Sequence, residues 1–305
     1  MAELSVHSDE FRLIEAVRRR EPPREDVSVG IGDDAAVLSD GTLLATDTLL
    51  EGVHFLAAAD PAAVGHKALA VNLSDIAAMG GQPTVATVAL TVGRSRSRVC
   101  PHAMMRGLQK TAAKYDVAVV GGDVTAWDGP LAITVTVLGT TDGLPPLLRS
   151  GASAGDCVCV TGPLGGSIHG RHLAVRPRLD VITALRTVGV SSLIDLSDGL
   201  ASDAAHVAAA SAAGIQLNAD AIPVHADVRA VGHDAIHHAL TDGEDFELMA
   251  TLPADRAAEA EASVPGLVVV GVVASEPGVC LRNATGVREL PPEGFSHTVA
   301  GEPGG

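Results

Sequence analysis

The sequence predicts a protein of two α+β domains, and three observations carry that prediction. The chain has 305 residues, enough for two domains of ordinary size. Helix and strand patterns intermix along it without the strict alternation of a parallel α/β sheet. A loop with Gly143, Pro145 and Pro146 marks the expected boundary between a domain at residues 1–145 and another at residues 146–305.

The first half is expected to begin with a helix that Ser8 is placed to cap. Asp60 and Pro61 are typical of the N-cap and first position of a long helix, which Gly80 and Gly81 would end. The other elements predicted in this half are a helix at residues 99–114 and strands at residues 27–29, 36–38, 42–46, 84–92, 117–120 and 131–138.

The second half is expected to begin with a strand at residues 157–161. Cys157 and Cys159 would lie on one face of this strand rather than in a metal site. A helix is predicted after residues 165–167 and another before Gly189. The other predicted elements are a helix at residues 200–212 and strands at residues 193–196, 215–217, 247–251 and 267–273.

The composition excludes several classes of protein. The formal net charge is −16, whereas a nucleic-acid binder needs a basic surface, so no nucleic-acid partner is expected. The sequence shows no apolar run long enough to cross a membrane and no signal-peptide pattern. Its four cysteines are too few and too scattered for a disulfide framework. We therefore expect a reduced, cytoplasmic protein with no membrane partner.

One glycine-rich motif, at residues 30–35, fits the G-x-G-x-x-A pattern of dinucleotide-binding loops. That pattern places a pyrophosphate over the loop, at the N-terminus of a helix. Here Asp33 and Asp34 would face the pyrophosphate, and the chain turns at residues 39–41 instead of continuing as a helix. Because two carboxylates suit a cation better, we interpret the motif as a candidate metal site.

Aspartates beside small residues recur at expected strand ends, loops and helix faces. A single Asp-Gly pair usually forms a turn, but most of these segments follow an apolar strand, where functional residues tend to lie. Oxygen ligands favour Mg²⁺, Mn²⁺ or Ca²⁺ over zinc. The six segments are Gly32-Asp33-Asp34, Ala45-Thr46-Asp47, Asn72-Leu73-Ser74-Asp75, Gly121-Gly122-Asp123, Asp195-Leu196-Ser197-Asp198-Gly199 and Asp242-Gly243-Glu244-Asp245.

Asp75 is the most informative of these aspartates. It shares a helix face with Asn72, and its neighbours along the helix are apolar nearly all round. A carboxylate in such surroundings is paired with a cation or bound to a metal. The chain has three lysines and no G-x-x-x-x-G-K-[ST] motif, so a bound nucleotide would need metal ions to neutralise most of its charge.

Three further patterns are weaker. His233 and His237 have the spacing of zinc ligands but no third partner, so a solvated helix face is expected. The segment at residues 161–167 could hold a phosphate or form only a tight turn. No G-x-S-x-G motif supports a hydrolase triad.

In combination, the motifs resemble those of the thiamine-monophosphate kinase family. The segments that carry the resemblance are Gly30–Val37, Thr46–Phe55, Lys67–Gly80, Gly121–Thr125, Arg149–Asp156, Ile194–Asp203 and Gly243–Leu248. The resemblance implies a fold shared with aminoimidazole ribonucleotide synthetase, selenophosphate synthetase and the hydrogenase-maturation carbamoyl dehydratase. It also implies a homodimer in which N-terminal domains pair around a shared barrel, with an α+β sandwich as the C-terminal domain.

The resemblance further implies an activity and a set of residue roles. The activity is direct in-line transfer of the γ-phosphoryl group of ATP to thiamine monophosphate, with several Mg²⁺ ions per active site. The implied roles are catalysis for Asp75 and Asp198; ATP contact for Gly122, Asp123, Arg149 and Ser197; substrate contact for His54 and Glu244; and metal binding for Asp34, Thr46, Asp47, Asp75, Asp123, Asp195 and Asp198.

Three departures from the family pattern affect these expectations. The segment between Ser167 and Arg176 is short, Pro292 stands where an aromatic residue stacks on the thiamine ring, and a tyrosine that contacts ATP is replaced near Met105. Two alternatives therefore remain. The chain could be another ATP-using member of the superfamily that acts on a different small metabolite, or a non-catalytic paralogue that binds nucleotide.

Overall fold

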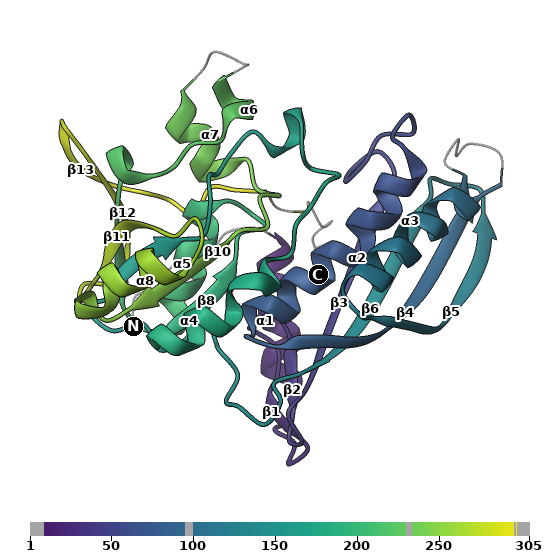
Figure 1. Ribbon diagram of the computed structural model, residues 1–305, viewed down its shortest axis with the longest axis horizontal. Coiled ribbons are helices and arrows are strands. Elements are labelled where there is room, and N and C mark those ends of the chain that lie inside the picture. Colours follow the sequence, from purple (N-terminus) through teal and green to yellow (C-terminus); the bar gives the residue numbers. More distant parts are fainter. Residues whose placement is uncertain (1–8, 95–99, 230–233, 296, 298–305) are drawn as a thin grey trace, which may run out of the picture.

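The computed structural model describes residues 9–94, 100–229, 234–295 and 297, and it contains two β-sheets that form two lobes (Figure 1). Within those residues the first sheet has the strand order β1-β2-β3-β6-β4-β5 and the second the order β13-β12-β9-β11-β7-β10-β8. Each sheet contains one parallel pair among antiparallel ones, β4 with β5 and β12 with β9. The prediction of an α+β protein built from two mixed units is confirmed.

In the described part of the chain, helices cover one face of the first sheet and leave the other uncovered. Because side chains alternate along a strand, Ile133, Val135 and Val137 of β6 all point into the core beneath these helices. The covering helices are α2 (Pro61–Ala78) and α3 (Pro101–Lys114). The strands are β1 (Val27–Val29), β2 (Ala36–Leu38), β3 (Thr42–Leu50), β4 (Gln82–Gly93), β5 (Ala118–Trp127) and β6 (Ala132–Thr140).

The other face of the first sheet is open and rich in threonine. Thr46 and Thr48 of β3 are exposed there, and their hydroxyls lie 3.0 and 2.8 Å from those of Thr136 and Thr134 on β6. The sheet ends at β5, whose ten residues are all exposed. An open face beside an exposed edge strand is a surface that other chains can pair with.

Helix α2 lies at the centre of the molecule. Its N-terminus is capped as predicted, because the Asp60 carboxylate accepts from the backbone N–H of Ala62 at 3.1 Å. It crosses α3 at close range, since a Cβ on Gly65 would lie 1.9 Å from the carbonyl oxygen of Met104. Its C-terminal end reaches the core of the second sheet through Ala77. Polar side chains near this end of the helix therefore lie between the two lobes.

The second sheet is covered on both faces. One face packs on α5, and the other packs on α4 and α8. Cys157 and Cys159 lie on the same face, as predicted, and the four cysteines are free. The helices are α4 (Ile182–Val188), α5 (Leu200–Ala210), α6 (Ala226–Arg229), α7 (Ala235–Thr241) and α8 (Ala257–Ser263). The strands are β7 (Cys157–Val160), β8 (Ser192–Asp195), β9 (Gly214–Asn218), β10 (Leu248–Leu252), β11 (Val268–Ala274), β12 (Gly278–Asn283) and β13 (Gly286–Glu289).

Several elements differ from the prediction. Strand β5 continues to Trp127, so Gly122 and Asp123 lie inside a strand instead of after it. Only a 3₁₀ turn at Ser167–His169 follows the glycines at 165 and 166, where a helix was expected. The short elements α6, α8, β12 and β13 were not anticipated, whereas α7 includes His237 of the expected helix face.

The N-terminal helix is present as α1 (Asp9–Arg20), but the proposed cap Ser8 lies outside the described residues. The predicted start of α3 at residue 99 also lies outside them. No helix in the described part of the chain is both long and apolar enough to cross a membrane.

Candidate active site

Three aspartates from distant parts of the chain meet between the two lobes. Asp34 lies in the turn between β1 and β2, Asp75 on α2, and Asp195 at the end of β8. One carboxylate oxygen from each lies within 4.8 Å of the others. The structure therefore joins three of the six predicted aspartate segments in one cluster, which we call the aspartate cluster.

Asp47 and Ser74 extend the aspartate cluster. Asp47 of β3 points to the helix-covered face of the first sheet, where burial raises its pKa and the charge of Asp34 raises it further. The Ser74 hydroxyl donates to Oδ2 of Asp195 at 2.6 Å.

Burial dominates the electrostatics of the aspartate cluster. It raises the pKa of Asp75 well above the ordinary value, and the charges of Asp47 and Asp195 raise it further. Burial also raises the pKa of Asp195, with the charge of Asp34 as the next cause. Two unit charges about 4 Å apart repel by roughly 4 kcal/mol at an effective dielectric constant of 20. The fully ionised cluster therefore needs cations.

Arg149 provides one cation at the edge of the cluster. Its Nη2 donates to Oδ1 of Asp34 at 2.6 Å, and its backbone N–H lies 3.3 Å from the carboxylate oxygens of Asp33. Two other oxygens, Oδ2 of Asp34 and Oδ1 of Asn72, are buried without a hydrogen-bond partner among the described residues. Since buried polar atoms are almost always paired, these oxygens indicate positions for a ligand.

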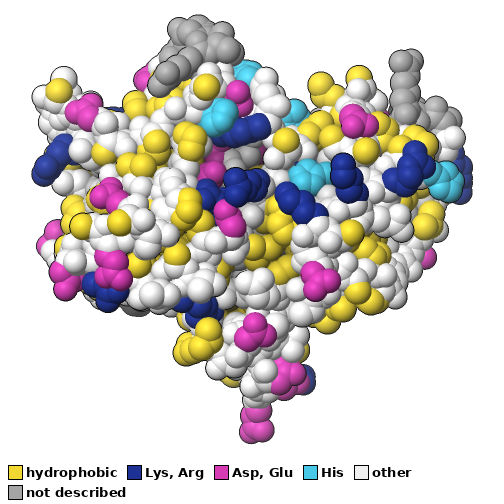
Figure 2. All heavy atoms as spheres, in the orientation of Figure 1, with side chains coloured by type: hydrophobic (Ala, Val, Ile, Leu, Met, Phe, Trp, Pro, Cys, Tyr) yellow, Lys and Arg dark blue, Asp and Glu magenta, His cyan; other side chains and the backbone are white. Residues whose placement is uncertain are grey.

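Most other cations lie on the surface. Figure 2 shows a row of Lys, Arg and His side chains across the lobe that contains α2 and α3. On α3 the exposed Arg106, Lys110 and Lys114 follow one another at intervals of four residues. Two of the three lysines are therefore exposed on this helix and cannot neutralise the buried carboxylates.

A cavity of about 580 Å³ opens beside the aspartate cluster. Asp47 and Asp75 form part of its wall, and the loop after β8 adds Ser197 and Asp198. Burial raises the pKa of Asp198 to about 6. A cavity of this volume can enclose a small metabolite. The other predicted site residues on its wall are Thr46, His54 and Glu244.

Asp203 belongs to the same region, although sequence reasoning gave it no role. Its carboxylate accepts from the backbone N–H groups of Asp198 and Gly199 at 3.3 and 3.1 Å. It also lies with Asp198 and His206 in a second group of potential metal ligands. The sequence signal that could have identified Asp203 is its position five residues after Asp198, in the first turn of α5. The observed contacts show that it holds the Asp198 loop.

His54 is placed to donate a hydrogen bond into the cavity. Burial, together with the nearby charges of Lys67 and His297, lowers its pKa to about 4. The ring is therefore neutral at pH 7. Its Nδ1 accepts from the backbone N–H of Leu50 at 3.0 Å, which places the proton on Nε2.

Two further rings lie beside His54 on the cavity wall. The ring of Phe295 is 6.2 Å from that of His54 and 5.0 Å from that of His297, measured between centroids. Pro292, the position at which we looked for a ring-stacking residue, is exposed and does not line the cavity. The rings beside His54 on the cavity wall therefore belong to Phe295 and His297. The sequence did not identify these two residues as ring-stacking positions.

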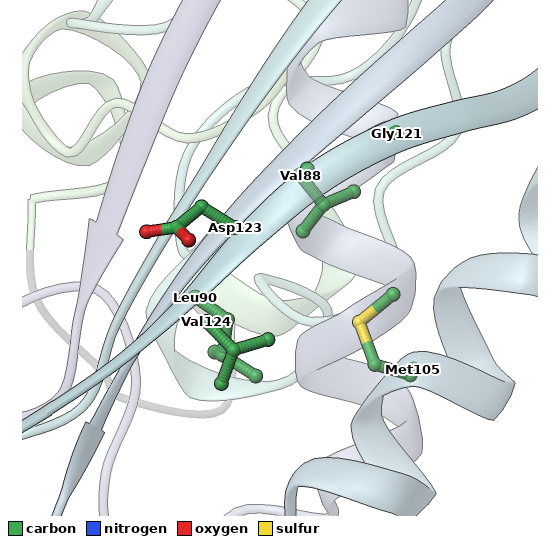
Figure 3. A pocket seen from close by; sticks show the side chains of 7 residues that line it. Val88, Leu90, Met105, Gly121, Asp123 and Val124 are labelled. Atoms are coloured by element: carbon green, nitrogen blue, oxygen red, sulfur yellow. The ribbon is translucent and has the colours of Figure 1, made fainter.

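Gly122 and Asp123 lie at a different place. They line a smaller cavity of about 330 Å³ between β4, β5 and α3, together with Met105 (Figure 3). In Figure 3 the Asp123 carboxylate points away from Val88 and Val124, toward the open face of the first sheet. Within one chain Asp123 is therefore not part of the aspartate cluster.

The glycine segment at residues 161–167 forms a tight turn, and its amides are occupied. The backbone N–H of Gly165 donates to both oxygens of Asp245, at 3.0 and 2.9 Å. That of Gly166 donates to Asp242 at 2.7 Å. These two acids of the sixth aspartate segment thus hold a loop.

Of the two histidines that have the spacing of zinc ligands, His237 lies on α7, whereas His233 is outside the described residues.

A family model agrees with the first lobe, and solved structures agree with the whole fold. Residues 32–141 match the family "AIR synthase related protein, N-terminal domain". The solved structure of AaThiL complexed with AMPPCP and TMP is 29% identical, with a TM-score of 0.85 over 97% of this chain and 99% of that chain.

Sequence similarity to characterised families extends across the chain. The thiamine-monophosphate kinase of Rhodopirellula baltica is 40% identical over 92% of this chain and 94% of its own length. That of Bacillus subtilis is 36% identical over 80% of this chain and 83% of its own length. From these similarities, together with the shared fold, the chain belongs to the thiamine-monophosphate kinase family.

Proposed function

We propose that this chain uses ATP to phosphorylate thiamine monophosphate to thiamine diphosphate, by direct in-line transfer of the γ-phosphoryl group. The observation that carries the proposal is the aspartate cluster beside a ring-lined cavity. Phosphoryl transfer between two anionic substrates needs cation-binding oxygens next to a site for the acceptor. The similarity to a structure that contains an ATP analogue and TMP supports this assignment.

Mg²⁺ ions fit the aspartate cluster. The donor atoms are oxygens, which Mg²⁺ prefers, and the unpartnered Oδ2 of Asp34 offers a buried ligand position. When bound, such ions would offset the negative charge of the phosphates and of the group in transfer. We propose that several Mg²⁺ ions are held by Asp34, Thr46, Asp47, Asp75, Asp195 and Asp198, with Asp123 as a ligand from a second copy of the chain.

The acceptor needs no general base from the protein. The second pKa of a phosphate monoester is about 6, so at pH 7 the acceptor is largely an anionic nucleophile. We assign to His54, through its Nε2–H, and to Glu244 the contacts that orient the acceptor in the cavity. Asp75 and Asp198 are the carboxylates that we place at the reacting phosphates.

We further propose that ATP lies between two copies of the chain. Asp123 and Thr48 lie on the same face of the first sheet, because β5, β4, β6 and β3 pair them through Ala89 and Thr134. Three strand spacings of about 4.8 Å separate them, so Asp123 is roughly 14 Å from β3. A second copy that packs on the open face could bring its Asp123 and Gly122 to the Arg149 and Ser197 of this chain.

The arrangement of the homodimer would follow from the same surface. The exposed edge strand β5 and the open threonine face support pairing of the first sheets of two copies around a shared barrel.

We propose an N-terminal metal- and ATP-binding domain at residues 1–145 and a C-terminal domain at residues 146–305. Free cysteines and the use of ATP favour a cytoplasmic location.

The test is an assay of the purified chain with MgATP and thiamine monophosphate. We expect equal amounts of ADP and thiamine diphosphate, measured by chromatography, and inversion of configuration at a chiral γ-phosphorus. Thiamine should be a poor acceptor, because its hydroxyl would have to lose a proton. Nucleotide binding without turnover would instead favour a non-catalytic paralogue, and retention of configuration would contradict direct transfer.

A further inference from the structure

Lys67 is the lysine that is not on α3, and it is completely buried. Its ammonium donates to the carbonyl oxygen of His54 at 3.0 Å and to Oε1 of Glu244 at 2.5 Å. Both acceptors belong to residues of the cavity wall, whereas Lys67 itself lies behind that wall. One cation therefore holds two wall residues that are 190 positions apart in the chain.

The ion pair also joins the two lobes. Lys67 lies on α2 of the first lobe, and Glu244 lies in the loop between α7 and β10 of the second. Breaking one partner of a buried ion pair leaves an uncompensated charge, so the position of each side chain depends on the other. Burial lowers the pKa of Lys67, and the charge of Glu244 opposes that effect.

The loop that carries Glu244 is held in a strained shape. Glu244 and Phe246 have φ values of 55° and 51°, a region that bulky residues rarely adopt. The backbone N–H of Glu244 donates to the carbonyl oxygen of Ser197 at 2.7 Å, and its own carbonyl accepts from the Ser167 hydroxyl at 2.7 Å. Its main chain is thereby anchored, and Lys67 is what anchors its carboxylate.

The second carboxylate oxygen is left for a ligand. Only Oε1 of Glu244 is engaged by Lys67, and among the described residues Oε2 takes part in no hydrogen bond. Glu244 nevertheless lines the cavity, close to the ring wall that includes Phe295. An oriented carboxylate oxygen beside aromatic rings suits a heterocycle that carries a positive charge or an N–H donor.

We propose that Lys67 is a positioning residue that fixes the Glu244 carboxylate on the cavity wall and thereby sets the affinity for the heterocyclic part of the acceptor. This inference rests on the proposed function. Among the described residues the Lys67 ammonium contacts His54 and Glu244 and no member of the aspartate cluster, so we expect its effect on binding and not on the rate of transfer. The expected signature is a change in KM for the acceptor at nearly constant kcat.

The experiment compares steady-state kinetics of the full-length enzyme and three variants. Lys67→Met is expected to raise KM for thiamine monophosphate about tenfold, with kcat and KM for ATP within about twofold of the parent values. Lys110→Met, an exposed lysine on α3, is the matched control and should change none of them. An unchanged acceptor KM in Lys67→Met, or a fall in kcat alone, would overturn the inference.

The double variant Lys67→Met/Glu244→Gln separates positioning from folding. It removes both charges of the pair, so its melting temperature should lie closer to that of the parent than does that of Lys67→Met. Its acceptor KM should nevertheless stay high. If KM returned to the parent value together with stability, the pair would be structural only. If Lys67→Met does not fold, a parent-like acceptor KM in the double variant would still overturn the inference.

The same experiment separates failure of this inference from failure of the proposed function. If the parent and Lys110→Met convert thiamine monophosphate but Lys67→Met has the parent KM, only the inference fails. If the parent shows no turnover, the binding of thiamine monophosphate is measured by calorimetry. Weaker binding to Lys67→Met than to the parent supports the inference. No binding to the parent would remove both proposals.

Discussion

The aspartate cluster and the β5 edge differ sharply, although the sequence marks them with the same kind of motif. Asp34 and Asp195 follow apolar segments beside small residues, as Asp123 does. In the structure the first two meet Asp75 in a cluster where Asp195 is buried and the other two are half-buried, whereas Asp123 is exposed on the open side of the sheet. One set of carboxylates is thus assembled within a single chain, whereas Asp123 lies apart from that set on an exposed strand.

The difference shows how the surroundings of a carboxylate decide what it can do. In the aspartate cluster, burial and mutual repulsion raise the pKa values, so the site is complete only when cations enter it. Among the described residues, the Asp123 carboxylate accepts a hydrogen bond from its neighbour Thr125 at 3.2 Å, and it lies on an exposed strand. Its contribution depends on what packs against β5. Mutations can therefore address the two regions separately.

The largest expected effect comes from the aspartate cluster. Asp75→Asn should lower kcat by about 1,000-fold or more, because the amide cannot replace a carboxylate as a ligand of Mg²⁺. The measurement is the rate of thiamine diphosphate formation at saturating substrates. Asp128→Asn, whose carboxylate is exposed, serves as the control and should keep full activity. An active Asp75→Asn enzyme would remove Asp75 from the site.

A mutation at the β5 edge should act by preventing two copies of the chain from assembling. Val120→Lys places a charge on an edge-strand residue that is 62% exposed in the single chain, so we expect the homodimer to dissociate and activity to fall about 100-fold. Sedimentation and activity would be measured over a range of protein concentrations. Val287→Lys, on the edge strand of the second sheet, should change neither. A monomeric but fully active Val120→Lys variant would show that the site needs no second copy.

A smaller effect is expected from the ring wall of the cavity. Phe295→Ala should weaken binding of thiamine monophosphate by about 1–3 kcal/mol, by analogy with stacking on nucleobases, which corresponds to roughly a 5- to 150-fold rise in KM. Pro292→Ala is the matched control, because Pro292 does not line the cavity. If Pro292→Ala raises KM and Phe295→Ala does not, the assignment of the ring wall is wrong.

The smallest expected effect is on stability, and it has a definite sign with pH. Because the folded-state pKa of Asp75 is raised, ionising it in the folded protein costs stability, and this cost grows as pH rises above the ordinary carboxyl range. Without metal, Asp75→Asn should therefore melt a few degrees above the parent protein at pH 8 and at nearly the same temperature at pH 4.5.

Mg²⁺ should reverse that order. It should raise the melting temperature of the parent protein, because the ion binds the folded state, and raise that of Asp75→Asn much less. The measurement is a thermal melt with and without Mg²⁺ at pH 8, which does not depend on activity. An equal rise in both proteins would mean that the ion binds elsewhere.

Much of the architecture could be predicted from local patterns. The cap at Asp60, the buried length of α2 and the one-face position of Cys159 follow from short-range preferences, and the structure confirms them. Strand β5 was predicted too short, because glycines at 121 and 122 usually interrupt a strand. Here a Cβ on Gly122 would lie 1.9 Å from the carbonyl oxygen of Val88, so glycine permits close pairing with β4.

The candidate site was only partly accessible from the sequence. The aspartate motifs named Asp34, Asp75 and Asp195, but no local feature stated that these three meet while Asp123 does not. Lys67 was considered only as part of a count of lysines, since nothing in its neighbours along the chain indicates Glu244 as a partner. Contacts between residues so far apart in the chain depend on how the two lobes pack against each other.

By itself the sequence determined the types of element, the faces that are buried, the set of oxygen-bearing side chains and the family. Those properties depend on periodicity and on motifs that lie within a few residues of one another. Only the tertiary structure decided which carboxylates share a site, that Phe295 and not Pro292 lines the cavity, and that Lys67 holds Glu244. The physical reason is that charge interactions and burial act through space, between groups that packing brings within a few ångströms.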